Sequence, residues 1–437
     1  MTSLRPVAPA AVAWISRTLE DAGYETWAVG GAIRDALLGR ASSEWDLATR
    51  ATPPQMRHLF RRTVPLGIEH GTVGVLTREG VMYEVTTFRK DVETDGRHAV
   101  VEFADSISDD LARRDFTVNA IAWHVARQEF HDPFGGARDL QAGVLRTVGL
   151  PEERFREDYL RILRGLRFAG RLGLEIDGAT WTAMRTLASH LPTLSPERIR
   201  EELLKVLASA KPSQALELYA TSGALGVLYP ELEALRVTDG DAGLRAEQTE
   251  RRGWDHALRV VDRLPSRLPH LRLAALLRPL ERQDIAAILT RLRLSNALIE
   301  EVARWAGADC IPPSTASEED VRRWLSTHGS TRLTAVARLD LAAARSGLGR
   351  DARDLAKAVV AAWRRARTVR RSRPPLAVGD LLVDGRDLIG MGLRPGPEFG
   401  EILEELLDWV LVDPARNEGR VLTARAREIA ARRAGGV

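Results

Sequence analysis

The stretch TWAVGGAIRDALLGRASSEWDLAT, residues 26–49, decides the fold of the N-terminal part of the chain. Its first four residues are β-branched, aromatic or small, which is typical of a short strand. Two glycines follow, and the apolar spacing of the next residues predicts a helix that stops at Gly39. The stretch closes on an acid-x-acid segment, residues 44–46. We therefore expect a strand, a glycine turn and a helix, followed by a second strand that carries acidic side chains.

The glycine pair stands where the expected strand ends and the helix begins. Glycine at Gly30 and Gly31 lets backbone N–H groups approach an anion closely, and Arg34, which precedes Asp35, can clamp a phosphate. A Gly-Gly pair alone is most simply a turn. It predicts a phosphate site only together with the acids that follow it.

Three carboxylates come from two expected strands. Glu44 and Asp46 are two residues apart, so on an extended strand both point to one face, where they can share divalent metal ions. Glu84, in the β-rich run 81–88, offers a third carboxylate from another strand. Beside a phosphate-binding turn, these acids predict a two-metal phosphoryl-transfer site with Glu44 and Asp46 as metal ligands. For the acid pair alone, a helix cap or a solvated loop is the alternative, since two serines precede it.

The character of the sequence changes at about residue 150. Before it, helical and strand signals alternate, with a charged, glycine-containing loop expected at 89–98; beyond it, apolar residues recur at helical spacing with almost no strand signal. The predicted fold class is α+β, with a small mixed-sheet head followed by a long all-helical remainder. We expect a head at 1–145, a helical neck at 146–222, a helical body at 223–370 and a helical tail at 371–437. The further strands expected in the head are 64–67, 72–77, 81–88 and 100–103.

The composition of the 437 residues, with 44% hydrophobic and 28% charged, is that of a globular protein. A run of about eighteen apolar residues, as a membrane span requires, does not occur. The N-terminus lacks the pattern of a signal peptide, and the single cysteine, Cys310, cannot form an internal disulfide. We therefore expect a cytoplasmic protein with no membrane partner.

Arginine dominates the basic residues, because only four of the 63 are lysine. The guanidinium group suits phosphates and base edges, so nucleic-acid binding is one interpretation. A GC-rich genome that writes arginine in place of lysine is the other. The arginines are spread along the whole chain, so composition does not decide between the two.

The pattern Gly-Gly-x-x-Arg-Asp followed by acid-x-acid resembles the signature of the DNA polymerase β-like nucleotidyltransferases. More narrowly, the chain is similar to the class II group, which comprises tRNA CCA-adding enzymes and bacterial poly(A) polymerases. The family has aspartate at both positions of its metal pair, whereas this chain has Glu44 at the first. The blocks that carry the narrower resemblance are HGTV at 70–73, TDGRH at 94–98, DLARRDFTVNA at 110–120, DPFGG at 132–136 and RFREDYLRILR at 154–164.

This resemblance implies a template-independent, Mg²⁺-dependent enzyme. The activity that it implies is the addition of CMP and AMP to tRNA 3′ ends from CTP and ATP, with release of pyrophosphate. It implies that Asp115 accepts from a ribose hydroxyl, although a buried pair with an arginine is equally open for that residue. The nucleotide-binding residues that it implies are Gly30, Gly31, Arg34, Asp35, Arg114, Asp115, Asn119, Asp158, Arg161, Arg164 and Arg167.

The resemblance also assigns selection of the base to Asp158 and Arg161. Cytosine and adenine both present an amino donor beside a ring-nitrogen acceptor, so a carboxylate can accept from the first and a guanidinium can donate to the second. Residues three apart share a helix face, which we expect for this pair, with Arg164 and Arg167 continuing that face toward phosphates. An ordinary salt bridge of Arg161 with Asp158 or Glu157 is the alternative.

The C-terminal half offers weaker signals. Residues 254–258 and 271–277 resemble the start of a metal-dependent phosphohydrolase, but Arg278 and Pro279 stand where its His-Asp metal ligands should be, so we expect a degenerate helical remnant that binds RNA. The tail is similar to that of CCA-adding enzymes and would grip tRNA by shape and phosphate contacts. The alternative functions are poly(A) addition, partial addition of CC or A only, and tRNA binding with catalysis impaired by Glu44. The segment 89–98 favours complete CCA addition.

Overall fold

The computed structural model describes residues 6–42, 44–94, 99–241, 253–347 and 349–434. Its contacts divide the chain into two compact units, one of residues 1–234 with 291–293 and one of residues 235–290 with 294–437. Among the helices described, none is long and apolar enough to cross a membrane.

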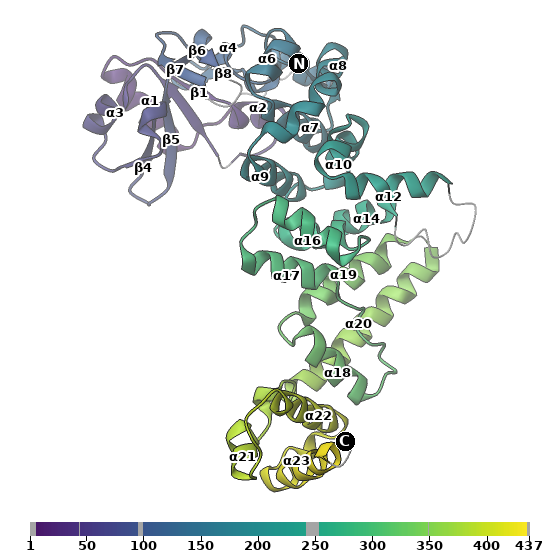
Figure 1. Cartoon of the computed structure of the whole chain (residues 1–437). Helices are drawn as coiled ribbons and strands as arrows, with labels where there is room; N and C mark the ends of the chain where they lie inside the picture. Colours follow the sequence, from purple (N-terminus) through teal and green to yellow (C-terminus); the bar gives the residue numbers. More distant parts are fainter. Residues whose placement is uncertain (1–5, 43, 95–98, 242–252, 348, 435–437) are drawn as a thin grey trace. The chain divides into compact units, whose positions relative to one another are not determined.

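A seven-stranded mixed sheet forms the core of the head (Figure 1), with strand order β3-β4-β5-β2-β1-β8-β9. β2 and β5 run parallel, and the other neighbouring strands are antiparallel. The predicted mixed sheet is confirmed, and the strand expected at 26–29 occurs with those bounds. The strands of the sheet are β1 (Thr26–Val29), β2 (Asp46–Thr49), β3 (Thr63–Pro65), β4 (Thr72–Leu76), β5 (Met82–Thr87), β8 (Ala122–His124) and β9 (Glu129–His131).

The loop expected at 89–98 is wrong over its first six residues. They form β6 (Arg89–Thr94), which pairs antiparallel with β7 (Ala99–Phe103) outside the main sheet. The polar composition concealed this strand, because backbone pairing does not require the apolar alternation by which strands are recognised. Residues 95–98, with most of the TDGRH block, lie outside the described residues.

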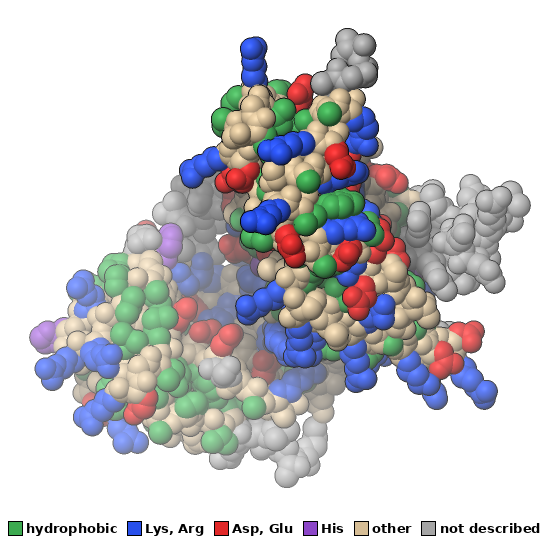
Figure 2. All heavy atoms as spheres, turned by 90° about the horizontal axis from the view of Figure 1, so that it is seen from below, with side chains coloured by type: hydrophobic (Ala, Val, Ile, Leu, Met, Phe, Trp, Pro, Cys, Tyr) green, Lys and Arg blue, Asp and Glu red, His purple; other side chains and the backbone are tan. Residues whose placement is uncertain are grey.

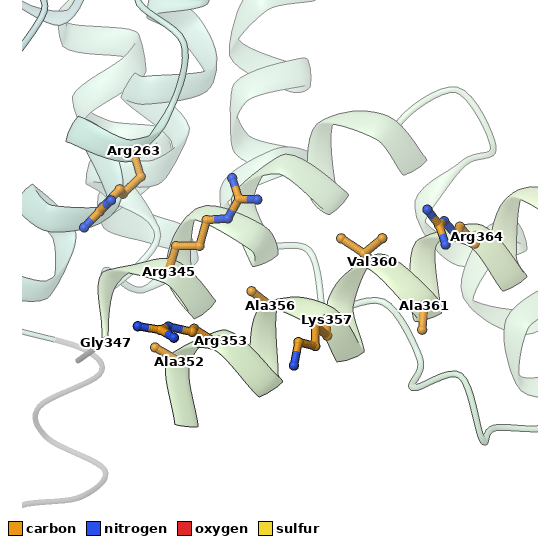
Figure 3. Close-up of a pocket in the computed structure, with 10 residues that line it drawn as sticks. All are labelled: Arg263, Arg345, Gly347, Ala352, Arg353, Ala356, Lys357, Val360, Ala361 and Arg364. Carbon is orange, nitrogen blue, oxygen red and sulfur yellow. The ribbon is translucent and has the colours of Figure 1, made fainter. Parts of the chain in front are cut away.

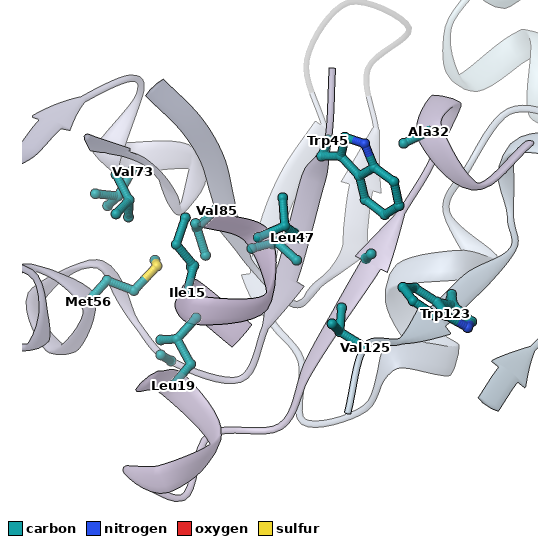
Figure 4. Close-up of a cluster of buried hydrophobic side chains, with 14 of the residues drawn as sticks. Ile15, Leu19, Ala32, Trp45, Leu47, Met56, Val73, Val85, Trp123 and Val125 are labelled. Atoms are coloured by element: carbon teal, nitrogen blue, oxygen red, sulfur yellow. The ribbon is translucent and has the colours of Figure 1, made fainter. Parts of the chain in front are cut away.

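The two faces of the sheet differ in how they are covered. On one face Leu47, Val73 and Val85 pack against Ile15 of α1 and Met56 of α3 (Figure 4). The other face is covered only in part, by a second apolar cluster that includes Leu111 of α4 and Trp27, Ala48 and Phe88. The helices of the head are α1 (Ala10–Asp21), α2 (Gly31–Leu37), α3 (Pro53–Leu59), η1 (Ile68–His70), α4 (Ile107–Ala112), η2 (Thr117–Asn119) and α5 (Gly136–Ala142).

Helices follow the head, and the first two, α6 and α7, are separated by a break in the helical neck expected at 146–222. α6 ends at Glu157, Asp158 has an extended backbone, and α7 begins at Leu160. The elements after the head are β10 (Val144–Leu145), α6 (Pro151–Glu157), α7 (Leu160–Leu172), β11 (Glu175–Ile176), α8 (Gly178–Leu187), η3 (Ala188–Thr193), α9 (Pro196–Leu207), α10 (Pro212–Thr221), α11 (Ala224–Leu228) and α12 (Pro230–Asp241).

The second unit is helical, as predicted. Within it α19 and α20 lie side by side (Figure 1). The buried guanidinium of Arg322 on α18 donates to the carbonyl oxygens of Leu411 and Val412 at the end of α22, at 2.6 and 2.8 Å. The helices are α14 (Trp254–Arg263), α15 (Pro269–Leu277), α16 (Arg282–Arg291), α17 (Asn296–Ala306), α18 (Glu318–His328), α19 (Leu333–Ser346), α20 (Gly349–Arg371), η4 (Val378–Asp380), α21 (Gly385–Gly390), α22 (Glu398–Val412), η5 (Pro414–Arg416) and α23 (Gly419–Ala434).

Close backbone packing of α7 on α10 gives a first prediction. A Cβ at Gly170 would stand 2.4 Å from the backbone nitrogen of Ala215, so one of the helices must shift to admit it. We expect Gly170→Ala to lower the free energy of unfolding of the first unit by about 1–3 kcal/mol, the usual cost of overpacking. Gly178→Ala, also in a helix, is the matched control, since its Cβ would meet nothing within 4 Å. Urea unfolding of both variants measures the effect, and equal midpoints would contradict it.

Candidate active site

The turn between β1 and α2 requires glycine at its first position. Gly30 has φ +75° and ψ −135°, a conformation that residues with a side chain rarely adopt. A Cβ there would also lie 3.2 Å from Nη1 of Arg114 and 3.8 Å from Oδ2 of Asp46. The bare glycine therefore lets an arginine and an aspartate approach the turn together.

Two of the three expected acids lie on adjacent strands. β2 begins at Asp46, and the parallel pairing of Leu47 with Val85 places Asp46 beside Glu84 on the partly open face of the sheet. The expectation that Glu44 lies on the same strand is wrong, because it precedes the strand. Its carbonyl oxygen accepts from the hydroxyl of Ser42, and its backbone N–H donates to that hydroxyl. Alternation nevertheless continues through this segment: Trp45 is buried, whereas Glu44 and Asp46 are exposed.

The carboxylates affect one another electrostatically. Although part of the Asp46 side chain is open to solvent, burial by the surrounding protein raises its pKa above the ordinary 3.8. Glu84 raises this pKa further, Arg114 opposes the rise, and Glu44 adds to it. Negative charge therefore collects here with too little positive charge to balance it, which is the situation a bound divalent cation relieves. In the described ranges, no three His, Cys, Asp or Glu side chains are already gathered as a metal site.

Arg34 is held inside the protein. It is buried, its Nε donates to Oδ1 of Asp35 at 2.9 Å, and its Nη1 donates to Oδ1 of Asn119 at 2.6 Å. Burial lowers the pKa of Arg34, and the neighbouring Asp35 opposes that effect. The guanidinium therefore fixes the glycine turn to the segment around Asn119.

The network continues from Asn119 into the helices that follow the head. Its Nδ2 donates to Oδ1 of Asp115 at 3.1 Å, and Nε of Arg164 on α7 donates to Oδ2 of the same carboxylate at 2.7 Å. Burial by itself would raise the pKa of Asp115, but Arg164 and these hydrogen bonds outweigh it, so the pKa is lowered. The attraction of Asp115 raises the pKa of Arg164 in turn. A pair of the buried Asp115 with an arginine, one of the two alternatives for this residue, is thus present, although the side chain of Arg164 is 35% exposed.

Arg167 does not lie on an open face, so the expectation for this residue is corrected. It is buried, and its Nε donates to Oε2 of Glu202 on α9, itself only 1% exposed, at 2.6 Å. Arg34, Arg164 and Arg167 all lie against the ring of Phe168, at 5.4, 5.4 and 4.2 Å from its centroid. Helical spacing predicts which face of α7 carries Arg167, but it does not predict that α9 packs against that face.

Asp158 and Arg161 are also arranged differently from the expectation of one shared helix face, because the chain breaks between α6 and α7. Arg161 pairs with Glu157 at 2.5 Å, which is one of the salt bridges left open as an alternative. Asp158 pairs with Arg198 at 2.7 Å. Arg161 also donates to the carbonyl oxygen of Arg113 at 3.3 Å, so this junction contacts the segment that carries Arg114. Sequence reasoning missed Arg198, since no motif surrounds it and it lies forty residues away.

The second unit carries no phosphohydrolase centre among its described residues. Arg278 occupies the position at which a phosphohydrolase would have a metal ligand, and it forms an ion pair with Asp340 at 3.1 Å. The backbone N–H of Ile311 donates to the same carboxylate at 2.9 Å, and His256 lies 3.2 Å from the hydroxyl of Ser346. An ion pair thus stands where metal binding would be needed.

Comparison with known proteins agrees with this geometry. Residues 26–146 match the family described as the poly A polymerase head domain, and residues 173–235 match a probable RNA and SrmB-binding site of polymerase A. The CCA-adding enzyme of Levilactobacillus brevis is 33% identical over 420 residues, which cover 94% of this chain and 95% of that protein. The chain belongs to the family of CCA-adding enzymes.

Another CCA-adding enzyme, that of Geobacillus kaustophilus, is 35% identical over 92% of this chain and 93% of its own length. The crystal structure of the Bacillus stearothermophilus CCA-adding enzyme in complex with CTP superposes with a TM-score of 0.73 at 30% identity, covering 98% of each chain. The resemblance drawn from the sequence motifs and the predicted fold class are confirmed.

The raised pKa of Asp46 gives a second prediction. A carboxyl whose pKa is higher in the folded than in the unfolded protein destabilises the fold when ionised, and this loss is complete above the raised pKa. Without metal, Asp46→Asn should therefore raise the urea midpoint at pH 8, and the gain should disappear as the pH falls below the ordinary value of 3.8. Asp105→Asn, at an exposed aspartate of the head, is the control. A lower urea midpoint for Asp46→Asn than for the wild type at pH 8 would contradict the claim that the ionised Asp46 destabilises the fold.

Proposed function

We propose that this chain is a cytoplasmic tRNA nucleotidyltransferase that builds the CCA end of tRNA from CTP and ATP, without a template, and releases pyrophosphate. The observation that carries the proposal is the position of Asp46 beside Glu84 at the Gly30 turn, in a chain of the CCA-adding family. Carboxylates next to a turn that an arginine approaches suit transfer of a nucleotidyl group.

The metal proposed is Mg²⁺, held by Asp46 and Glu44 with Glu84 beside them. When bound, it would lower the pKa of the attacking 3′ hydroxyl and neutralise charge on the triphosphate. Oxygen ligands of this kind suit the ion, and Glu84 and Glu44, which both contribute to the raised pKa of Asp46, favour a positive charge beside it. Arg114, adjacent to both Gly30 and Asp46, is placed to meet the triphosphate.

The buried network would position the nucleotide rather than react with it. Asp115 stays ionised, since its pKa is lowered, and a carboxylate has room for a further donor such as a ribose hydroxyl. Arg34 and Asn119 hold the turn and the carboxylate in register. The proposed base-reading pair, Asp158 and Arg161, lies at the α6–α7 junction, where each already has one ionic partner and keeps further hydrogen-bonding capacity for a base.

A basic groove in the second unit is suited to the tRNA backbone (Figure 3). It encloses about 760 Å³ between α14, α19 and α20, and none of the described residues that line it is acidic. Aliphatic residues of α20 form part of its wall. Basic and acidic side chains are interspersed over the face that Figure 2 presents. The groove, where basic side chains gather, therefore indicates an RNA-binding surface better than the arginine content of the chain does. The basic residues that line it are Arg263, Arg345, Arg353, Lys357 and Arg364.

Product length on a truncated tRNA tests the proposal. With CTP and ATP, the purified protein should add three nucleotides to a tRNA that lacks its CCA end. Asp46→Asn should reduce incorporation about 10³-fold or more, because several kcal/mol of charge stabilisation are lost with the metal site. Denaturing gels with labelled nucleotide resolve each addition. Addition of CC only, of A only or of a long A tail would assign the chain to one of the alternative activities of the same fold.

Glu44 provides a separate test of catalytic competence. Its carboxylate is one methylene longer than the aspartate of the family pattern, and Mg²⁺ tolerates poor geometry badly. Because Glu44 is exposed and precedes β2, the backbone can absorb this length, and we expect the protein to be active as it stands. Glu44→Asp should then change kcat for CTP incorporation by less than about tenfold, that is by less than 1.4 kcal/mol. Activity that appears only in Glu44→Asp would support the impaired, tRNA-binding alternative.

A further inference from the structure

An apolar surface continues the row of carboxylates on the partly open face of the sheet. Glu84 on β5 lies directly opposite Gly74 on β4, and Asp46 is its neighbour on the other side. Leu66, which follows β3, and Met82, which precedes Glu84 by two residues on β5, both extend their apolar side chains over Gly74. They are 36% and 43% exposed. We name Leu66, Met82 and the bare Gly74 between them the apolar shelf.

Gly74 is what allows the shelf to form. A Cβ at this position would stand 2.7 Å from Sδ of Met82 and 2.9 Å from Cδ1 of Leu66. The two side chains therefore lie across the space that a side chain on β4 would fill. Solvent-facing positions of a half-covered sheet are usually polar, so exposed apolar side chains beside carboxylates indicate a surface for a ligand.

We propose that the apolar shelf seats the terminal nucleobase of the RNA acceptor and so brings its 3′ hydroxyl to Asp46 and Glu84. This inference rests on the proposed function. In nucleotidyl transfer the 3′ oxygen forms a bond to the α-phosphorus while the bond to pyrophosphate breaks, and the attacking and leaving oxygens stand roughly in line. The strand order puts the Gly30 turn and Arg114 on the β1 side of the carboxylates and the shelf on the β4 side. A molecule on the shelf would approach from opposite the triphosphate.

The chemistry of the shelf fits an acceptor base whose identity is not fixed. Leu66 and Met82 offer no hydrogen-bonding group that could read a base edge, but every base has an apolar face. The 3′-terminal base of the acceptor is first that of the truncated tRNA and is cytosine before each of the next two additions, so the acceptor site must accept more than one base. The flexible thioether of Met82 can adapt to purines and pyrimidines alike. Selection remains with the incoming nucleotide, and the acceptor is held without regard to sequence.

A double-mutant cycle between protein and RNA tests the proposal. The protein variants are Leu66→Ser with Met82→Ser, and the control pair is Val227→Ser with Leu355→Ser, which are 37% and 44% exposed elsewhere. The acceptors are minihelices that lack CCA and end in either a normal or an abasic nucleotide. Wild-type kcat/KM should fall about tenfold on the abasic acceptor, as expected for loss of one stacked base.

On the normal acceptor the shelf variant should lose about as much as the abasic end costs the wild type, with KM for CTP unchanged, whereas the control variant should behave as wild type. On the abasic acceptor the shelf variant should lose little more, because the contact is already absent. Met82→Gln alone, which nearly keeps the volume, should show a smaller loss in the same direction and guards against misfolding of the double variant. Three results would each overturn the proposal: the loss from the shelf variant and the loss from the abasic acceptor multiply, the KM for CTP rises in the shelf variant, or the shelf variant is as active as the wild type.

Two further outcomes separate the alternatives. If the wild type extends no acceptor with CTP and ATP, the proposed function fails and the shelf proposal falls with it. If the wild type extends normal acceptors but the cycle is additive, only the shelf proposal fails. Sedimentation supplies the other check, because self-association of the wild type that the shelf variant abolishes would make the shelf an interface between copies and overturn the proposal.

Discussion

The buried hydrogen-bond network from Arg34 through Asn119 and Asp115 to Arg164 is the interaction on which the site depends. It joins the glycine turn, the segment after α4 and helix α7, which are far apart in the sequence. Each buried polar group in it has a partner of opposite charge or matching hydrogen-bond type, which is what makes burial of charge tolerable. Asp115 and Asn119 are buried, so removing either partner would leave a buried polar group without its hydrogen bond. The relative placement of these segments is therefore strongly specified.

The carboxylates show the opposite arrangement, because they are brought together without enough compensating charge. Parallel pairing of β2 with β5 places Asp46 beside Glu84, and Arg114 offsets their repulsion in part. A fold selected for stability alone would not keep ionised groups in this state. Strain of this kind is typical of a site that binds cations, where stability is given up for function.

Three kinds of surface lie next to one another across the partly open face of the sheet. A glycine turn with an arginine lies at the β1 side, carboxylates lie on β2 and β5, and an apolar surface lies at β4. Glycine is needed at both ends for steric reasons that differ. Gly30 adopts a positive φ and admits Arg114, whereas Gly74 has an ordinary backbone and makes room for Leu66 and Met82. The proposed function and the proposed acceptor site together place the two reactants on opposite sides of these acids.

The sequence by itself determined the β1–α2 turn, the mixed sheet of the head and the helical remainder, because these follow from local propensity, apolar periodicity and glycine placement. It also determined the family, since motifs such as GGAIRD and DLARRDFTVNA are contiguous. Tertiary structure decided the partners of the charged residues. Arg167 pairs with Glu202 and Asp158 with Arg198, both on α9, and the chain breaks between α6 and α7. Those contacts join residues about forty positions apart, and periodicity, which reports only which face a residue occupies, carries no information about what packs against that face.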